Sequence, residues 1–177
     1  QLSETPEILG SGPAINPRIV TWARLAVISR PADGKTSPYP ADYRGHWENT
    51  QEFYVFNTHF FSGTDYPLAK LNSARLIMER IHKLERFGEW TKERPVFLMG
   101  DFNSKPGGKV YEIFVGNESS GDPLFLKDSA KGGREIDWIL YKGNAQVLSC
   151  EKVDYNVKGI YPSDHKPILV EFKILDE

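Results

Sequence analysis

The stretch PVFLMGDFNSKP, residues 95–106, places an acid and an amide directly behind a short apolar run. The nearly continuous apolar character of residues 95–99 predicts a short buried strand, and Gly100 marks the point where a loop should begin. Asp101 and Asn103 then stand two residues apart at the strand end. Such a pair can be simple turn chemistry, in which both side chains bond to nearby backbone groups. It can equally be a functional pair, because strand ends are where a rigid scaffold brings side chains together.

Three further segments repeat the pattern of a strand-like run followed or interrupted by an ionisable residue. VFNTH ends at His59, REIDWIL contains Asp137, and YPSDHKP contains Asp164 and His165. Each segment is ambiguous alone, since a single histidine after a strand is more often a surface or core residue than a catalytic one. Asp137 is harder to dismiss, because a carboxylate among apolar neighbours needs a partner if it is buried. Together the segments predict one cleft lined by two histidines and three carboxylates.

Hydrophobic periodicity predicts an α+β fold, or α/β sandwich, in which helices cover sheets. Two strands, at 19–28 and 52–60, are expected to pair as a hairpin around a long polar loop at 30–51. A helix of about five turns is expected between Pro67 and Gly88, because apolar residues recur there every three or four positions. The remaining elements are a strand at 95–101, a short helix at 107–116 and strands at 135–141, 145–155 and 167–175. The apolar stripe of the long helix comprises Leu68, Leu71, Ala74, Ile77, Met78, Ile81, Leu84 and Phe87.

The composition narrows the class of protein. With 177 residues, of which 40% are hydrophobic, the chain is long enough to bury a core, and one domain over residues 1–177 is expected. A formal net charge of -2 provides no global basic field for nucleic acid, so an anionic substrate would have to be met by a cation in the cleft. No apolar run is long enough to span a bilayer, and the single Cys150 excludes an internal disulfide. The chain as given is expected to be soluble, in a compartment that the sequence leaves open.

Four motifs, in this order and context, resemble those of one known family: NTH at 57–59, GDFNSKP at 100–106, EIDWIL at 135–140 and SDHKPI at 163–168. The family is the endonuclease/exonuclease/phosphatase superfamily, whose members have the deoxyribonuclease I-like fold. The resemblance implies a four-layer sandwich of two sheets between helices. It also implies a divalent-metal-dependent phosphoester hydrolase, which includes phosphodiesterases, nucleases and phosphatases.

The reaction of this family is in-line attack of water on a phosphoester, and the resemblance assigns the matching residues to its steps. Asp101 is expected to orient and deprotonate the water, and Asn103 to donate a hydrogen bond to the phosphoryl group. His165 is expected to contact a non-bridging phosphate oxygen while Asp137 holds the imidazole in place. His59 is expected to bind the phosphate from the other side or to protonate the leaving oxygen.

The resemblance also implies a Mg2+ or Mn2+ ion, with Asp164, Asp101 and Asn103 as its ligands in this chain. Zinc is disfavoured, because the sequence contains neither paired histidines at helical spacing nor a second cysteine. The substrate stays open, since the fold serves nucleic acids and small phosphorylated molecules alike. The loop at 30–51 is expected either to select the substrate or to be a surface insert.

Members of the family usually have additional residues on the N-terminal side. The chain begins at Gln1 with a stretch that resembles the middle of their domain. We therefore expect the C-terminal portion of such a domain, without the region that supplies an Asn and a Glu, the Glu as a metal ligand. Missing partner strands would leave an apolar sheet face exposed, for a homo-oligomer or a complementing N-terminal segment to cover. Two interpretations stay open: a catalytic piece of a hydrolase, and a truncated or degenerate module with a structural or interaction role.

Overall fold

The computed structural model describes residues 18–26, 51–63, 66–86, 94–116, 124–130 and 135–175. The predicted loop at 30–51, except for its last residue Gln51, lies outside these ranges, as do the last two residues of the first predicted strand. The observed order of elements is the predicted one, apart from the two-residue strand β4, which is too short for a hydrophobic period to reveal. The elements are β1 (Val20–Ala26), β2 (Glu52–His59), α2 (Pro67–Arg86), β3 (Val96–Asp101), α3 (Lys109–Val115), β4 (Lys127–Asp128), β5 (Asp137–Lys142), β6 (Ala145–Lys152) and β7 (Ile168–Ile174).

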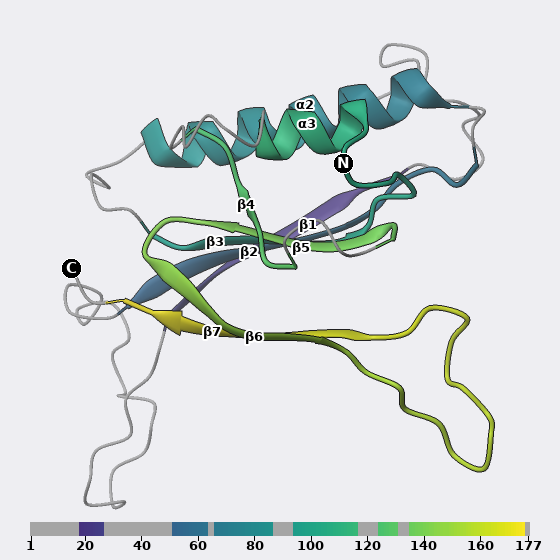
Figure 1. Ribbon diagram of the computed structural model, residues 1–177. Coiled ribbons are helices and arrows are strands. Elements are labelled where there is room, and N and C mark those ends of the chain that lie inside the picture. Colours follow the sequence, from purple (N-terminus) through teal and green to yellow (C-terminus); the bar gives the residue numbers. More distant parts are fainter. Residues whose placement is uncertain are drawn as a thin grey trace, which may run out of the picture.

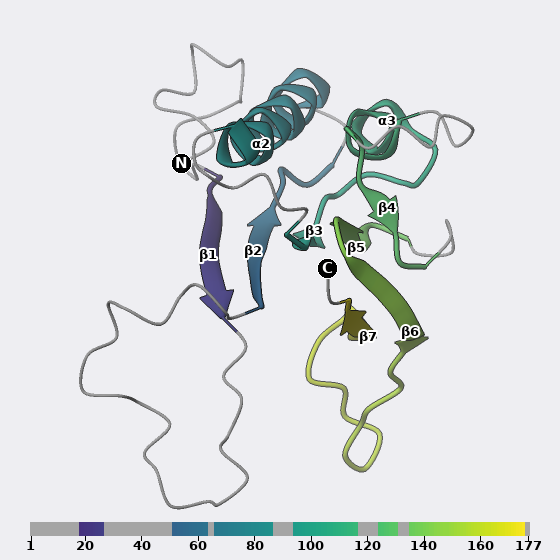
Figure 2. The ribbon, with the colours of Figure 1, turned by 90° about the vertical axis from the view of Figure 1, so that its left-hand side faces the viewer.

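The strands form two sheets, and the helices cover one of them (Figure 1). The larger sheet has the strand order β1-β2-β3-β5-β4, with β1 at one edge and β4 at the other (Figure 2), while β6 and β7 form a separate hairpin. β2 and β3 run parallel and are joined by α2, whereas the other neighbouring strands run antiparallel, including the predicted pair β1 and β2.

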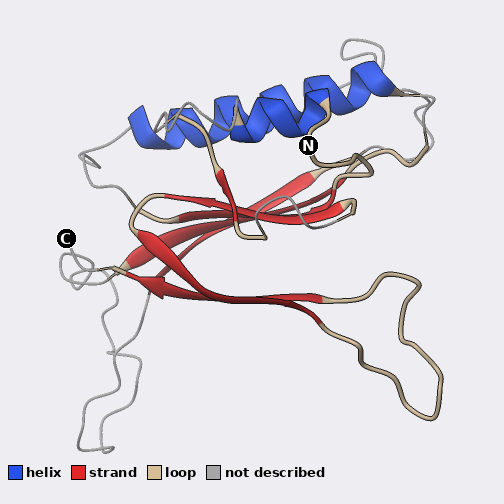
Figure 3. Ribbon diagram, viewed as in Figure 1, coloured by secondary structure: helices blue, strands red, loops and turns tan. Residues whose placement is uncertain are grey.

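Helices, larger sheet and hairpin make three layers in the described part of the chain. α2 and α3 lie on one face of the larger sheet, and the β6–β7 hairpin lies against the opposite face (Figure 3). Phe97 of β3 contacts Phe172 of β7 across the second interface, with ring centroids 4.6 Å apart. The α/β sandwich predicted from the sequence is therefore confirmed.

Alternation along the central strands gives each of them one face toward the helices and one toward the hairpin. Phe56 of β2 and Leu98 of β3 are fully buried in the core beneath the helices. Phe53 and Phe97, at the intervening positions, contact each other on the hairpin side at 5.8 Å. In β2, β3 and β5, even-numbered residues consequently face the helices and odd-numbered residues face the hairpin.

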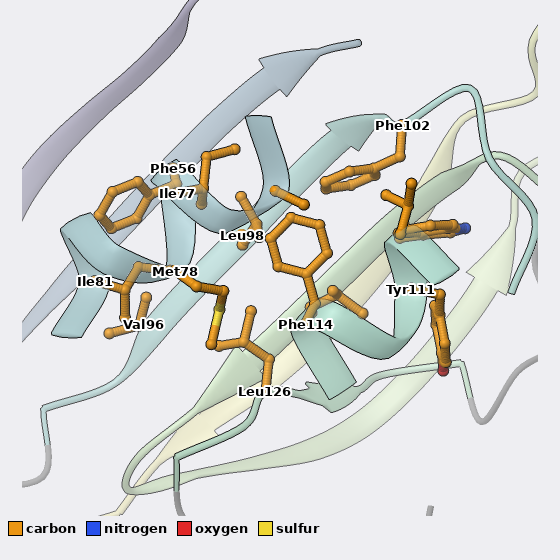
Figure 4. Packing of buried hydrophobic residues seen from close by; sticks show 14 of the residues in the cluster. Phe56, Ile77, Met78, Ile81, Val96, Leu98, Phe102, Tyr111, Phe114 and Leu126 are labelled. Atoms are coloured by element: carbon orange, nitrogen blue, oxygen red, sulfur yellow. The ribbon is translucent and has the colours of Figure 1, made fainter. Parts of the chain in front are cut away.

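The core between the helices and the larger sheet combines aromatic and aliphatic side chains (Figure 4). Phe102 stacks on Trp138 with ring centroids 4.5 Å apart, and Phe114 of α3 meets Phe102 edge-on at 5.4 Å. Complete burial of one such side chain stabilises a fold by roughly 1.5–3 kcal/mol. Because Phe102 stands between Asp101 and Asn103, this packing fixes the end of β3 to the core.

The long helix α2 begins at Pro67, as predicted, where a missing N–H removes no hydrogen bond. Its buried stripe differs from the predicted one in the first turn. Leu68, a member of the expected stripe, is 54% exposed, whereas Lys70 is 7% exposed. Lys70, Ala74 and Ile77 follow one another on the inner face at steps of four and three. Apolar periodicity takes no account of a lysine, so the pattern predicted that Leu68 is buried where the structure buries Lys70.

Most of the large apolar side chains that are exposed within the described ranges are found in three places. They lie on the edge strand β1, on the β6–β7 hairpin and on the loop that joins β6 to β7. Exposed apolar side chains of this kind are typical of surfaces that another polypeptide covers. None of the described helices is both long enough and apolar enough to cross a membrane. The exposed residues in these places are Ile19 directly before β1, Trp22 and Leu25 on β1, Leu148 and Leu169 on the hairpin, and Tyr155, Val157, Ile160 and Tyr161 on the loop.

Candidate active site

Three strand ends bring His59, Asp101 and Asp137 together in one row. His59 pairs with Asp101 between the parallel strands β2 and β3, and Asp101 pairs with Asp137 between the antiparallel strands β3 and β5. All three are odd-numbered, so their side chains project from the face of the sheet that meets the hairpin. This alternation explains why an acid can stand within the apolar segment EIDWIL. Trp138 points into the core and is 1% exposed, whereas the side chain of Asp137 points to the other face and is 32% exposed.

Gly100 allows β3 to approach β2 closely enough to form this row. Its φ of 149° lies in a region that residues with a side chain rarely adopt. A Cβ at this position would lie 1.9 Å from the backbone oxygen of Thr58 on β2. The glycine of MGDFN is therefore required by the backbone, and a side chain there would displace Asp101.

Asp101 and Asn103 form the turn that the sequence allowed as one interpretation. The backbone N–H of Asn103 donates to Asp101 Oδ1 at 2.8 Å, and its side-chain Nδ2 donates to Asp101 Oδ2 at 3.3 Å. Nδ2 also donates to the carbonyl of Phe60 at 3.0 Å, and Asn103 has a left-handed φ of 48°. Asn103 thus holds both oxygens of the Asp101 carboxylate, and its amide hydrogens already have partners within the chain.

The loop between β6 and β7 supplies His165 to the same place. Its Nδ1 lies 2.8 Å from Asp137 Oδ2, so the expected contact between these two residues is present. An imidazole that donates from Nδ1 leaves Nε2 for a ligand. The hydrogen bond with Asp137 and its negative charge raise the pKa of His165 above the ordinary 6.5, and Asp101 and Asp164 act weakly in the same direction. The backbone N–H of His165 donates to Ser163 Oγ at 3.0 Å, which gives the serine of SDH a role in ordering the turn.

His59 contacts the same acid from the other side of the row. Its Nε2 lies 3.4 Å from Asp101 Oδ2, and its side chain is 57% exposed. The Asp101 side chain is 19% exposed. The predicted residues His59, Asp101, Asn103, Asp137 and His165 are therefore gathered around one carboxylate.

Asp101, Asp137 and His165 form a group that could hold a metal ion, since each offers a ligand atom and these atoms lie within 4.8 Å of one another. The two carboxylates suit a hard divalent cation such as Mg2+ or Mn2+, whereas the imidazole is a ligand that transition metals prefer. Of the ligands expected from the sequence, Asp101 belongs to this group, while Asn103 is bonded to Asp101. Asp164 is exposed and lies beside the group, where it lines a hollow of about 300 Å³ together with Asp137 and His165.

Two lysines, Lys152 and Lys166, line the same hollow. Lys152 Nζ lies 3.3 Å from a Glu135 oxygen, and Lys166 Nζ lies 2.7 Å from an Asp154 oxygen. Each of these two lysines thus has an acid as a partner. Protonated imidazole or a bound cation would add positive charge for an anionic ligand.

Besides the two lysines of the hollow, sequence reasoning missed a third lysine, which bonds to the turn after β3. Lys70 of α2 donates to the backbone oxygen of Asn103 at 2.7 Å. The available signal was a lysine four residues before Ala74 on the inner face of a predicted amphipathic helix, a position where an apolar residue is normal.

Comparisons with known proteins point to the same family as the four sequence motifs. Residues 82–165 match the model of the endonuclease/exonuclease/phosphatase family, a range that contains Asp101, Asn103, Asp137 and His165. A probable CCR4-Not complex 3'-5'-exoribonuclease subunit of Encephalitozoon cuniculi (strain GB-M1) is 31% identical over 156 residues, which cover 66% of this chain and 31% of the relative.

Two solved structures share the fold over nearly the whole chain. An endonuclease/exonuclease/phosphatase family protein from Bacteroides thetaiotaomicron has a TM-score of 0.68 at 22% identity, over 99% of this chain and 64% of that one. A mannosyl-6-phosphatase of Bacteroides thetaiotaomicron VPI-5482 has a TM-score of 0.64 at 24% identity, over 97% of this chain and 63% of that one. The chain thus spans less than two thirds of these structures and about a third of the curated relative. With its four motifs, its sandwich of helices and sheets and these matches, the chain belongs to the endonuclease/exonuclease/phosphatase superfamily.

Proposed function

We propose that this chain carries catalytic residues of a phosphoester hydrolase that requires a divalent cation and works by in-line attack of water. The observation that supports this most directly is the row of His59, Asp101 and Asp137, completed by His165 from the opposite layer. In phosphoryl transfer the protein acts mainly by positioning and charge neutralisation. Acids and imidazoles that converge on one hollow are suited to both tasks.

Asp101 is proposed to orient and deprotonate the attacking water. Asn103 holds one carboxylate oxygen through its backbone N–H and the other through its amide, which fixes the direction of the remaining lone pairs. A base in a fixed direction is what proton abstraction from one water molecule requires. In this arrangement Asn103 acts through Asp101. The hydrogen bond to the phosphoryl group expected from the sequence would require the amide to give up Phe60 or Asp101.

His165 is proposed to stabilise negative charge on a non-bridging phosphate oxygen. Asp137 fixes the ring through Nδ1 and raises the pKa of His165, so the positively charged imidazolium persists to higher pH than in a free histidine. His59 lies on the other side of Asp101 and is more than half exposed. From there it would bind the phosphate or protonate the leaving oxygen.

Asp101 and Asp137 are proposed to hold the cation, Mg2+ or Mn2+, with Asp164 beside them as a further oxygen ligand. When bound, such an ion neutralises charge on the phosphate as it develops in the transition state. Carboxylate oxygens are the ligands that both ions prefer.

The whole protein is proposed to contain more than the described layers. Residues 1–177 would form the C-terminal portion of the domain, because the chain spans less than two thirds of the solved structures it matches. A complementing N-terminal segment, or a second copy in a homo-oligomer, would cover the apolar side chains exposed on β1 and on the hairpin. The substrate would be a nucleic acid or a small phosphorylated molecule, since the relatives include an exoribonuclease subunit and a mannosyl-6-phosphatase by name.

The test is hydrolysis of bis(p-nitrophenyl) phosphate, a diester, and p-nitrophenyl phosphate, a monoester, with Mg2+ and with EDTA. We expect Asp101→Ala and His165→Ala each to lower the rate by roughly 10²- to 10⁴-fold. Glu79→Gln serves as the control, because Glu79 is an exposed partner of Lys83 on α2. Hydrolysis that survives EDTA, or that both alanine variants retain, would contradict the mechanism. A folded chain that binds Mn2+ but hydrolyses neither ester would favour the alternative, a non-catalytic structural or interaction module.

A further inference from the structure

Lys70 lies in the first turn of α2 and joins two loop segments at the base of the candidate site. Its Nζ donates to the carbonyl of Gly63 at 2.6 Å and to the carbonyl of Asn103 at 2.7 Å, and the residue is 7% exposed. Gly63 lies in the segment that leaves β2 after His59, and Asn103 lies in the segment that leaves β3 after Asp101. One buried ammonium group thus connects the two strand ends that carry these side chains.

The backbone at one of the two acceptors is in a conformation that calls for support. Asn103 has a φ of 48°, in the left-handed region, whereas Gly63, with a φ of 72°, adopts that region without strain. Residues with a side chain adopt that region rarely, although asparagine tolerates it better than most. In Asn103 the same residue offers its carbonyl to Lys70 and its N–H to Asp101 Oδ1. A donor that fixes this carbonyl therefore also fixes the N–H that aims the Asp101 carboxylate.

The helix itself does not explain a lysine at this position. A positive charge in the first turn is opposed by the helix dipole, and no acidic residue in the first turn of α2 offsets it. Burial lowers the pKa of Lys70 by desolvation, and the charge of Asp101 opposes that shift. The compensating interactions come from outside the helix, from the two loop carbonyls and from Asp101.

We infer that Lys70 is a positioning residue, which ties the strand ends of His59 and Asp101 together and holds Asn103 in the conformation that orients Asp101. It acts through Asn103 and does not touch the substrate. The effect of Lys70 on the rate of hydrolysis rests on the proposed function, whereas its effect on the backbone conformation of Asn103 does not.

Three variants separate positioning from general stability. Lys70→Met keeps the length of the side chain and removes its donors, and Lys70→Arg keeps donors and charge. Lys83→Met is the matched control, because Lys83 is an exposed lysine on the same helix, paired with Glu79. With bis(p-nitrophenyl) phosphate and Mg2+, at a temperature well below every unfolding midpoint, we expect Lys70→Met to lower kcat by about 10- to 100-fold with little change in KM. Lys70→Arg should recover part of this loss, and Lys83→Met should match the unmodified chain.

A second measurement needs no activity. The backbone carbon chemical shifts of Asn103 report its left-handed φ, and in Lys70→Met they should move toward the values of ordinary loop residues. The hydrogen bond between Asp137 and His165 should persist, because the hydrogen bonds of the Lys70 ammonium go to Gly63 and Asn103. If the unmodified chain hydrolyses no phosphoester, the proposed function fails and this measurement still decides the inference. Unchanged Asn103 shifts in Lys70→Met would overturn it, whatever the rate. If Lys70→Met does not fold, Lys70→Gln is compared in the same way.

Discussion

Asp101 and Asp137 are direct cross-strand partners at the ends of β3 and β5. Like charges placed opposite each other destabilise a sheet, so this pair requires compensation from positive groups. His165 bonds to Asp137 and His59 contacts Asp101, which leaves the two acids bracketed by imidazoles. The pairing therefore favours any ligand that brings further positive charge between the strand ends.

Cation binding should stabilise the chain measurably. A ligand that binds the folded state at 100 times its dissociation constant adds about 2.7 kcal/mol to the free energy of unfolding. We expect Mg2+ or Mn2+ to raise the midpoint of thermal unfolding, and EDTA to reverse the effect. The double variant Asp101→Asn with Asp137→Asn should lose most of the cation-dependent increase, while Glu79→Gln should keep it. An unmodified chain whose midpoint ignores both cations at millimolar concentration would speak against a metal site here.

Gly100→Ala should be far more destabilising than an alanine at another glycine with positive φ. At Gly100 the new Cβ would lie 1.9 Å from the Thr58 oxygen, which forces β2 and β3 apart, whereas at Gly107, with a φ of 76°, nothing lies within 4 Å. We expect a loss of about 3 kcal/mol or more for Gly100→Ala and about 1 kcal/mol for Gly107→Ala. Urea unfolding followed by circular dichroism measures both, and equal losses would mean that the close approach of the two strands is not what requires the glycine.

The row of strand ends could be anticipated from local signals, but its geometry could not. The continuous apolar run before Asp101 and the alternation of apolar and polar residues before His59 each indicated the end of a strand, because buried and half-buried strands have these two patterns. That His59 and Asp101 share one level follows from the parallel register of β2 and β3, which is set by α2 and by tertiary packing. The same packing decides which face of β5 carries Asp137.

What the sequence concealed were contacts made by backbone groups. Lys70 bonds to two carbonyls, and no residue pattern records where a carbonyl points. The double role of Asn103 is hidden for the same reason, since turn chemistry and site chemistry use the same amide. β4 was missed because two residues cannot show a period.

Glu52 should contribute strongly to stability although it lies far from the candidate site. Its side chain is fully buried at the start of β2, where Arg24 approaches one carboxylate oxygen at 2.5 Å and Arg94 the other at 2.9 Å. Glu52→Gln removes the buried negative charge that both arginines contact, so we expect it to cost about 3 kcal/mol. Glu79→Gln removes an exposed ion pair with Lys83 on the surface of α2, and we expect little change in stability. Urea unfolding of both variants makes the comparison, and equally small effects would mean that the buried carboxylate contributes no more than a surface acid does.

The pair of Asp137 and His165 should give the chain a pH dependence of known sign. Asp137 raises the pKa of His165 above 6.5 in the folded state, so the folded chain binds this proton more tightly than the unfolded chain does. The resulting stabilisation is fully present below about pH 6.5, and it is lost as the pH rises through the raised value. In Asp137→Asn the principal cause of the shift is gone.

We therefore expect an NMR titration of His165, recorded with EDTA present, to have a midpoint above 6.5 in the unmodified chain and a lower one in Asp137→Asn. The difference in unfolding free energy between the two chains should be largest at acidic pH and should shrink as the pH rises above neutrality. His82, on the helix side of the larger sheet, reports any general effect of the substitution on histidine signals. If the alkaline limit of hydrolysis reflects the imidazolium of His165, it should move to lower pH in Asp137→Asn by the same amount as the titration midpoint. Identical midpoints in the two chains would mean that the 2.8 Å contact does not hold in solution.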